Sequence, residues 1–231
     1  MSEIVDSLPL PKMNVVVREP WLVELCRGKD VLHLGCADTL YTDERLATLD
    51  ALMHHRLSKV AKKLVGVDIS RENLDKLRGR FPEWELVEGD VENLDKSSLT
   101  GKFDIVLAGE IIEHLGAPAH FLRSTLPFLK ERTGRLVITT PNHFGTRRFL
   151  HLFRGREKYH PHHTCYYSYN TLKNLLAFNG YDLETALGYS SFVDPKSLFK
   201  RLFYSVIEDL PGKLFSSHSC EGLIFVAKRK T

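Results

Sequence analysis

The sequence of 231 residues lacks the marks of several protein classes. Its four cysteines, Cys26, Cys36, Cys165 and Cys220, form no C-x-x-C pair, so it has no zinc or dithiol redox motif. No apolar run reaches the roughly 18 residues that a membrane-spanning helix needs. The first residues, MSEIVDSLPLPK, are acidic and contain prolines, which does not fit a signal peptide. We therefore expect reduced thiols and a cytoplasmic location.

A strong charge of either sign is also missing, because 32 basic residues face 29 acidic ones and the net charge is +3. Such slight basicity does not by itself indicate a nucleic-acid-binding protein. The sequence contains no G-x-x-x-x-G-K-[ST] phosphate-binding loop. A hydrophobic content of 43% is enough for a core, and the length suits one domain over residues 1–231.

Short apolar runs alternate with helical patterns through the first two thirds of the chain. Strands are predicted at 31–35, 64–68, 84–90, 103–109 and 134–140. Helices are predicted at 42–62, 71–80, 92–99 and 117–132. Strands linked by helical crossovers, each nearly continuous in apolar residues, predict an α/β fold with a mostly parallel sheet covered on both faces.

This alternation ends after residue 140. An insert at 143–167 is rich in proline, histidine and arginine, and a helix is predicted at 168–179, with Gly180 as its cap. Two further strands are predicted at 181–189 and 222–228, with an amphipathic helical segment at 194–210 between them. Late strands without a regular crossover predict an antiparallel pair at one edge of the sheet.

Residues that can bind a ligand follow the ends of four successive strands. Ligands bind open parallel sheets beyond the carboxyl ends of the strands. The candidates there are Gly35, Cys36 and Asp38 after the first strand, Asp68 and Ile69 at the second, Asp90 and Val91 at the third, and Gly109 and Glu110 at the fourth.

These residue types suit an adenosine. Gly35 lets the backbone approach a ligand. The Asp68 carboxylate can accept both ribose hydroxyls, and Asp90 can accept the exocyclic amine of an adenine held between Ile69 and Val91. The spacing from Gly35 to Asp68 exceeds the roughly 20 residues of a dinucleotide fingerprint. An adenosine that carries an amino-acid tail is therefore the better fit.

Five motifs occur in order between Val31 and Asn142: VLHLGCAD, VGVDIS, VEGDVENL, FDIVLAGEIIEHL and GRLVITTPN. The series resembles that of class I S-adenosylmethionine-dependent methyltransferases. The resemblance implies a Rossmann-like, doubly wound, seven-stranded sheet of order 3-2-1-4-5-7-6 with the last strand antiparallel. It also implies S-adenosylmethionine as cofactor, with methionine contacts around Gly35, ribose contacts at Asp68, adenine contacts near Asp90 and Val91, and backbone contacts at Gly109.

Two positions depart from the family pattern. His33 stands where the family usually has an acidic residue, and Ala37 stands where it has a second glycine. The acidic residue helps to hold the loop and the methionine ammonium, so its loss could weaken cofactor binding unless Asp38 takes its place. A non-catalytic adaptor that keeps the fold is therefore one alternative, against which Asp68, Asp90 and the GEIIEHL run argue.

The catalytic candidates come from the same GEIIEHL run. Glu110, Glu113 and His114 have the spacing i, i+3, i+4, which would place them on one face of a helical turn pointing into the cleft. Two carboxylates and an imidazole can bind a divalent ion or supply a general base. They can also be structural, since acidic residues are favoured in the first turn of a helix. We predict His114 as the base, with His163 second, and assign no metal ligand.

The insert is the candidate acceptor region. Residues 143–163 contain five of the eleven histidines, together with Arg147, Arg148, Arg154 and Arg156 interleaved with Phe144, Phe149 and Phe153. One hypothesis is a lid that grips an anionic or lipid-linked acceptor and makes weak contact with a membrane surface. The other is a solvated basic loop.

The E-x-x-E-H run resembles two kinds of methyltransferase. Followed by a distant histidine, it resembles the metal site of small-RNA 3′-terminal 2′-O-methyltransferases. Followed by TTPN and a basic aromatic insert, it resembles ubiquinone-pathway O-methyltransferases. Since no RNA-binding module accompanies it, we expect O-methylation of a small-molecule acceptor: a sugar, phenol or lipid-linked precursor. RNA 2′-O-methylation is the alternative, and we do not expect a nucleic-acid partner.

Overall fold

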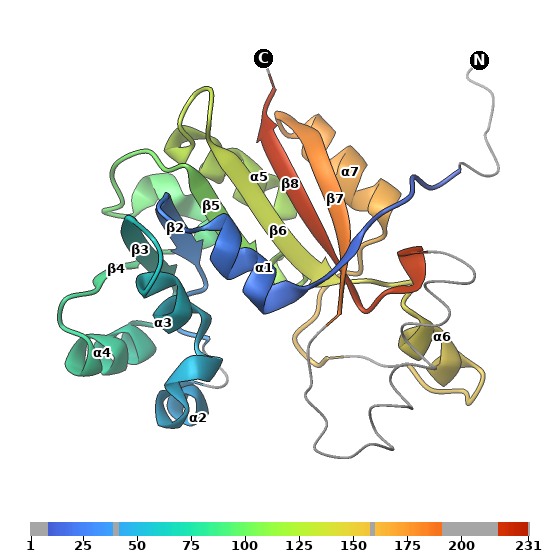
Figure 1. The fold of residues 1–231 in the computed structure, drawn as a ribbon, viewed down its shortest axis with the longest axis horizontal. Coiled ribbons are helices and arrows are strands. Elements are labelled where there is room, and N and C mark those ends of the chain that lie inside the picture. Colours follow the sequence, from blue (N-terminus) through green and yellow to red (C-terminus); the bar gives the residue numbers. More distant parts are fainter. Residues whose placement is uncertain (1–8, 39–41, 158–159, 191–216, 231) are drawn as a thin grey trace.

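The computed structural model describes residues 9–38, 42–157, 160–190 and 217–230. Within them, one mixed sheet of eight strands carries helices on both faces (Figure 1). Its spatial order is β1-β7-β8-β6-β5-β2-β3-β4. The strands are β1 (Val15–Val17), β2 (Asp30–Leu34), β3 (Lys63–Asp68), β4 (Glu85–Glu88), β5 (Ile105–Gly109), β6 (Arg135–Pro141), β7 (Tyr181–Ser190) and β8 (Gly222–Arg229).

Seven of these strands stand in the predicted order. Counted from β2, the sequence β4-β3-β2-β5-β6-β8-β7 is 3-2-1-4-5-7-6, and β8 runs antiparallel to both of its neighbours. The predicted count of seven was wrong, because β1 pairs in parallel with β7, with Val16 opposite Tyr189. The antiparallel pair therefore does not form the edge of the sheet. Three consecutive valines favour a strand, but the run is too short to be distinguished in the sequence.

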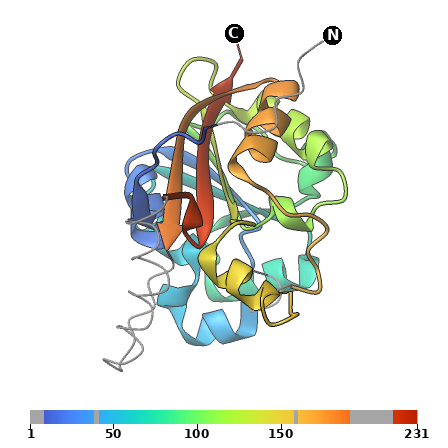
Figure 2. The ribbon, with the colours of Figure 1, turned by 90° about the vertical axis from the view of Figure 1, so that its right-hand side faces the viewer.

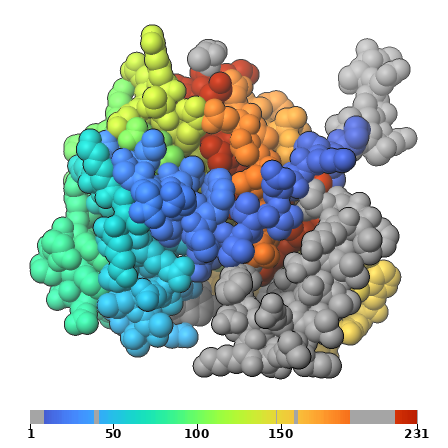
Figure 3. Space-filling model, viewed as in Figure 1, coloured from blue at the N-terminus to red at the C-terminus, as the bar shows by residue number. Residues whose placement is uncertain are grey.

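Seven α-helices are described: α1 (Arg18–Leu25), α2 (Thr42–Ala47), α3 (Met53–Ser58), α4 (Arg71–Arg80), α5 (Pro118–Thr125), α6 (Thr146–Leu152) and α7 (Tyr169–Phe178). Leu122 of α5 and Leu172 of α7 belong to the largest core cluster, whereas Leu22 of α1 and Leu57 of α3 belong to a second one. These pairs of helices cover opposite faces of the sheet (Figure 2). In the space-filling view, the segment from β1 to α1 lies across the front of the molecule (Figure 3).

The predicted helices agree with the structure where caps define them. Helix α4 begins after Ser70, whose hydroxyl accepts the Asn73 amide. Helix α7 begins with a capping box formed by Ser168 and Thr171, and Gly180 beyond its end has a positive φ of 88°.

The other three predicted helices are shorter or broken. The segment 42–62 divides into α2, a 3₁₀ turn (Leu49–Ala51) and α3. The segment 117–132 is α-helical only to Thr125, because Pro127 has no amide hydrogen to continue the ladder and a 3₁₀ turn follows. The segment 92–99 is a 3₁₀ turn over Val91–Lys96.

The strands β2 to β6 are parallel, so their carboxyl ends open at the same edge of the sheet. The loops to α2 and α6 leave from this edge (Figure 1). The amphipathic segment predicted at 194–210 lies outside the described residues. No helix in the described part of the chain is long and apolar enough to cross a membrane.

Candidate active site

One cavity of about 670 Å³ opens at the carboxyl ends of the parallel strands. Its volume falls in the range of small-molecule sites, roughly 300–1,000 Å³. Every residue predicted for the cofactor or for catalysis lines it: Gly35, Cys36, Asp38, Asp68, Ile69, Asp90, Val91, Gly109, Glu110, His114 and His163. The cavity thus brings together residues from four strand ends and from the insert.

The loop after β2 has a shape that requires Gly35. Its φ is +67°, and a Cβ at this position would lie 2.8 Å from Cδ1 of Ile111. Asp68, which is buried, accepts the Ala37 amide and the Ser70 amide, each at 3.0 Å. Asp68 therefore fixes the loop and lines the cavity at the same time. The neighbouring Cys36 is buried, and burial raises the pKa of its thiol well above the usual range, so it remains a thiol.

Asp38 was the predicted substitute for the missing family carboxylate. It has a positive φ of 54° and forms an ion pair with Arg45, and both side chains line the cavity. Burial raises the pKa of the Asp38 carboxyl, while the Arg45 guanidinium opposes that rise. A carboxylate is thus present near the loop, although an arginine already neutralises it.

The adenine end of the predicted site lies between β3 and β4. The Asp90 carboxylate accepts the Glu92 amide at 2.9 Å and the Asn93 side-chain amide at 2.8 Å, which caps the 3₁₀ turn after β4. Ile69 keeps 69% of its surface exposed beside the cavity, and Val91 is half-buried. Their apolar side chains could hold a flat ring between them.

A pair of buried histidines lies beneath the cofactor loop. His33 of β2 lines the cavity, and its Nδ1 lies 3.1 Å from Nδ1 of His54 in α3. Because the two nitrogens share one hydrogen, one ring donates and the other accepts. Burial lowers the pKa of His33 to about 4 and that of His54 well below its ordinary value. At neutral pH, an uncharged pair therefore stands where the family has a carboxylate.

The predicted helical turn over the E-x-x-E-H run is present for Glu113 and His114 but does not include Glu110. Glu110 has a positive φ of 54°, and Ile112–His114 form a 3₁₀ turn instead of an α-helix. Glu110, Glu113 and His114 nevertheless all line the cavity. They converge because the chain turns sharply at Glu110.

A polar network holds Glu110 in this conformation. Its Oε1 accepts hydrogen bonds from Thr139 at 2.8 Å and Tyr189 at 2.9 Å, and the Arg18 guanidinium lies 3.4 Å away. Arg18 also stacks over the Tyr189 ring, 5.3 Å from its centroid. Sequence reasoning missed Arg18 and Tyr189. The position of Tyr189 at the end of a predicted strand was a signal that could have identified it. Arg18 offered no such signal, because it precedes the whole motif series.

Glu113 is buried behind this network. Its Oε2 accepts the Thr140 hydroxyl at 3.0 Å, whereas its Oε1 has no hydrogen-bond partner among the described residues. Burial, together with the nearby Glu110 charge, raises the pKa of the Glu113 carboxyl. The protonated form is therefore favoured more than in a free glutamate.

The geometry assigns the proton on His114. Its Nδ1 lies 3.1 Å from the carbonyl oxygen of His162, which can only accept, so Nδ1 carries the hydrogen. The lone pair of the neutral ring is then on Nε2. Burial lowers the pKa of His114, so the ring is uncharged at neutral pH and able to accept a proton.

Two histidines of the insert surround His114. The His114 ring centroid lies 4.6 Å from that of His163 and 5.6 Å from that of His160, and one nitrogen of each ring lies within 4.8 Å of the other two. Burial lowers the pKa of His163 to about 4, so its ring is uncharged at neutral pH. Three neutral imidazoles could hold a transition metal such as zinc. The sequence led us to predict no metal ligand and no role for His160. The H-P-H-H run at residues 160–163 was the signal that could have identified this cluster.

The fold and this cavity define a cofactor-binding α/β domain of the class I methyltransferase type. The chain matches the family model described as a methyltransferase domain over residues 21–186, and it belongs to that family.

Among curated proteins, a probable S-adenosylmethionine-dependent methyltransferase of Mycolicibacterium smegmatis is 26% identical over 72% of this chain and 57% of its own length. A mitochondrial ubiquinone biosynthesis O-methyltransferase of Schizosaccharomyces pombe is 31% identical over 61% of this chain and 47% of its own. The chain thus spans about half the length of these relatives. The fold also resembles that of a solved S-adenosylmethionine-dependent methyltransferase from Archaeoglobus fulgidus, with a TM-score of 0.54 and 20% sequence identity. The match covers 91% of this chain and 90% of the Archaeoglobus chain.

These matches confirm the predicted class and S-adenosylmethionine as its cofactor. The roles of the individual site residues remain predictions. All of these residues line the same cavity.

Proposed function

We propose that this protein uses S-adenosylmethionine to methylate a hydroxyl group of a small-molecule acceptor. The observation that carries the proposal is the contact between His114 Nδ1 and the His162 carbonyl oxygen, because it leaves the lone pair of a neutral ring on Nε2, in a residue that lines the cavity beside the predicted cofactor site. A hydroxyl is a poor nucleophile until it loses its proton, so a neutral imidazole at this place suits an oxygen acceptor.

The names of similar proteins give further support. One relative is an O-methyltransferase of ubiquinone biosynthesis, at 31% identity over 143 residues. Such a name suggests a phenolic acceptor with a lipid tail for this chain too, within the wider class of sugars, phenols and lipid-linked precursors.

The chain's own groups would divide the work. Asp68 and Asp90 would bind the adenosine, and the Gly35 turn would admit the methionine portion. When bound, the cofactor supplies an electrophilic methyl group on a sulfonium. The acceptor oxygen must lie in line with that methyl group, and alignment and exclusion of water provide most of the acceleration. As the new C–O bond forms and the S–C bond breaks, His114 Nε2 would take the hydroxyl proton.

A second candidate is metal-assisted transfer, as in the RNA 2′-O-methylation alternative. The cluster of His114, His160 and His163 is the observation that favours it. A metal ion there would lower the pKa of the acceptor hydroxyl in place of a free base. The adaptor alternative has less support, because such a protein would not need an open cavity lined by these residues.

The test is methyl transfer to catechol and to a catechol with a long alkyl chain, with O-methylated product measured by mass spectrometry. In His114→Ala, turnover should fall about 10²–10⁴-fold, while calorimetry shows unchanged affinity for S-adenosylhomocysteine. The control is His143→Ala, an exposed histidine of the insert that does not line the cavity.

Turnover of His114→Ala close to that of the wild type would remove His114 from the proposed role. Cofactor binding without methylation of any hydroxyl acceptor, combined with transfer to an amine or carbon acceptor, would refute the oxygen assignment.

A further inference from the structure

Helix α6 and the residues on either side of it expose several bulky apolar side chains. Phe144, Phe149, Leu150, Leu152 and Phe153 are between 39% and 76% exposed. They make up more than half of the large exposed hydrophobic residues in the described part of the chain. We call these five residues the α6 apolar surface. Large exposed apolar side chains gathered on one segment of a globular protein are typical of a site of interaction with a protein or a membrane.

An ordinary surface helix turns its apolar side inward, whereas α6 leaves its large apolar side chains exposed. Here Thr146 and Arg148 line the cavity, while Phe149 and Leu150, which follow directly, are exposed. Helix α6 therefore contributes Thr146 and Arg148 to the candidate active site and leaves its large apolar side chains exposed.

Contacts with the body of the protein fix this orientation. The Thr146 hydroxyl donates to the Ser219 carbonyl at 3.2 Å, and Gly145 packs so closely that a Cβ would lie 2.9 Å from the Cys220 carbonyl. Arg148 lies over the Tyr166 ring, 5.6 Å from its centroid. The exposed Phe149 and Phe153 meet edge to face at 5.0 Å. The apolar surface is thus held outward by a structured helix.

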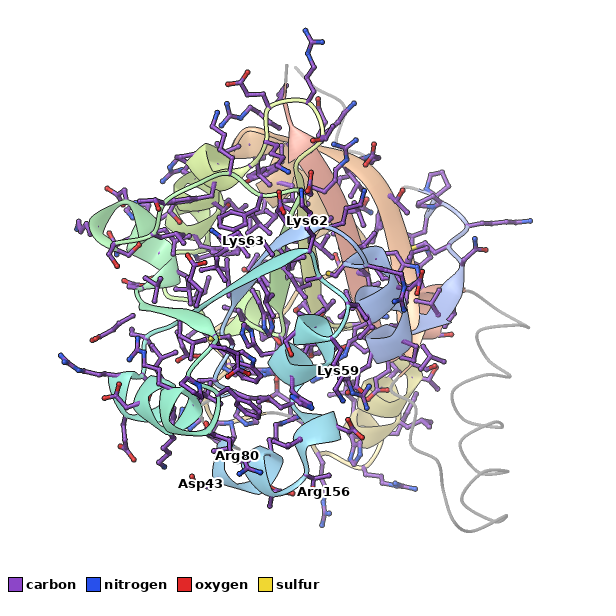
Figure 4. All side chains as sticks on the ribbon, turned by 60° about the vertical axis from the view of Figure 1, so that its left-hand side comes forward. Asp43, Lys59, Lys62, Lys63, Arg80 and Arg156 are labelled. Atoms are coloured by element: carbon purple, nitrogen blue, oxygen red, sulfur yellow. The ribbon has the colours of Figure 1, made fainter. Side chains whose placement is uncertain are left out.

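Basic residues border the α6 apolar surface. Arg154 and Arg156 are exposed directly after it, with Glu157 as the acidic neighbour. The Arg156 side chain lies at the lower edge of the molecule in Figure 4. Exposed aromatic and leucine side chains beside arginines match the boundary between acyl chains and anionic headgroups. A second copy of the chain is a poorer partner, because a symmetric contact would bring the two arginine borders together.

We propose that the α6 apolar surface, with Arg154 and Arg156, docks this protein on an anionic lipid bilayer. Because α6 also lines the cavity, docking would set the entrance close to the membrane surface. Delivery of a lipid-linked acceptor from the bilayer rests on the proposed function, whereas docking itself does not.

The test is co-sedimentation of the full chain with vesicles of equal parts phosphatidylcholine and phosphatidylglycerol, and with vesicles of phosphatidylcholine alone. The wild type should bind the anionic vesicles, and added salt should weaken this binding. The double variant Phe149→Ser, Phe153→Ser should bind about tenfold more weakly. Phe178→Ser is the matched control, since Phe178 is 86% exposed on α7 and does not belong to the surface. Its binding should equal that of the wild type.

Calorimetry with S-adenosylhomocysteine checks that the variants remain folded and keep the cofactor site. Wild-type protein that binds cofactor but neither kind of vesicle would overturn the proposal and leave the proposed function intact. Equal loss in the Phe178→Ser variant would also overturn it. So would concentration-dependent self-association in light scattering that the double variant abolishes, since a second copy would then be the occupant. Wild-type protein that binds the anionic vesicles but transfers no methyl group to a hydroxyl acceptor would count against the proposed function alone.

Discussion

The buried histidine pair beneath the cofactor loop should make this protein sensitive to mild acid. Folding keeps His33 uncharged, because burial lowers its pKa from 6.5 to about 4. As the pH falls below 6.5, the unfolded chain takes up a proton at this residue while the folded chain does not. The unfolded state then binds more protons, so the free energy of unfolding decreases with falling pH.

The expected size follows from the two pKa values. Each unit of pKa difference corresponds to roughly 1.4 kcal/mol, and most of this difference is felt between pH 6.5 and 4. For His33 alone, the loss between pH 7 and pH 5 is about 2 kcal/mol. The pKa of His54 is lowered too, so it acts in the same direction. No loss from this pair is expected between pH 7 and 9.

The assay is urea unfolding at pH 7 and pH 5, followed by tryptophan fluorescence. Trp84 is a local reporter, because its ring lies edge to face with His54 at 4.7 Å. His33→Asn keeps a hydrogen-bonding side chain but cannot take up a proton in this range, so its loss of stability should be about 2 kcal/mol smaller. The control is His120→Asn, an exposed histidine on α5. The reasoning is refuted if wild type and His33→Asn lose the same stability between the two pH values.

Two other perturbations test the site. In Asp68→Asn, one of the two backbone amides bound to the carboxylate loses its acceptor and the predicted ribose contact loses its charge. A charge-assisted hydrogen bond contributes about 1.5–3 kcal/mol, so calorimetric affinity for S-adenosylhomocysteine should fall about tenfold to a hundredfold; unchanged affinity would contradict the assignment of Asp68. If the cluster of His114, His160 and His163 holds a metal, a chelator should lower methyl transfer and zinc should restore it, and His160→Ala should abolish the restoration. Activity indifferent to both would leave the histidines to proton transfer and packing.

Much of the fold could be predicted because the parallel strands β2, β3, β5 and β6 are largely buried and read as apolar runs. The order of seven strands followed from the resemblance, and β8 lies antiparallel as it implied. The strand β1 was not predicted, because three residues are too few to show the alternation or apolar run that indicates a strand. The break in the predicted helix at residues 49–51 could not be predicted from local turn preferences, which are weak. It accompanies the packing of Leu52 and Leu57 into different core clusters.

The candidate site was predictable where residues follow strand ends directly, as Asp68 and Glu110 do. What could not be predicted was how they are held. The positive φ of Glu110 depends on Tyr189 and Arg18, which lie 79 and 92 residues away in the chain. Likewise, the His33–His54 contact joins a strand to a helix, and no sequence periodicity reports it. Such partners are set by tertiary packing.

The strand β1 and helix α1 have a practical consequence for the boundaries of the domain. The match to the family starts at residue 21, but the preceding residues pair with β7 and send Arg18 to Glu110. A shortened protein beginning at residue 21 would leave the backbone of β7 as an open edge, which invites intermolecular pairing. It would also strip the guanidinium from Glu110 and so leave that carboxylate without its cation at the cavity wall. The amino-terminal segment therefore belongs to the working unit, outside the stretch by which the family is recognised.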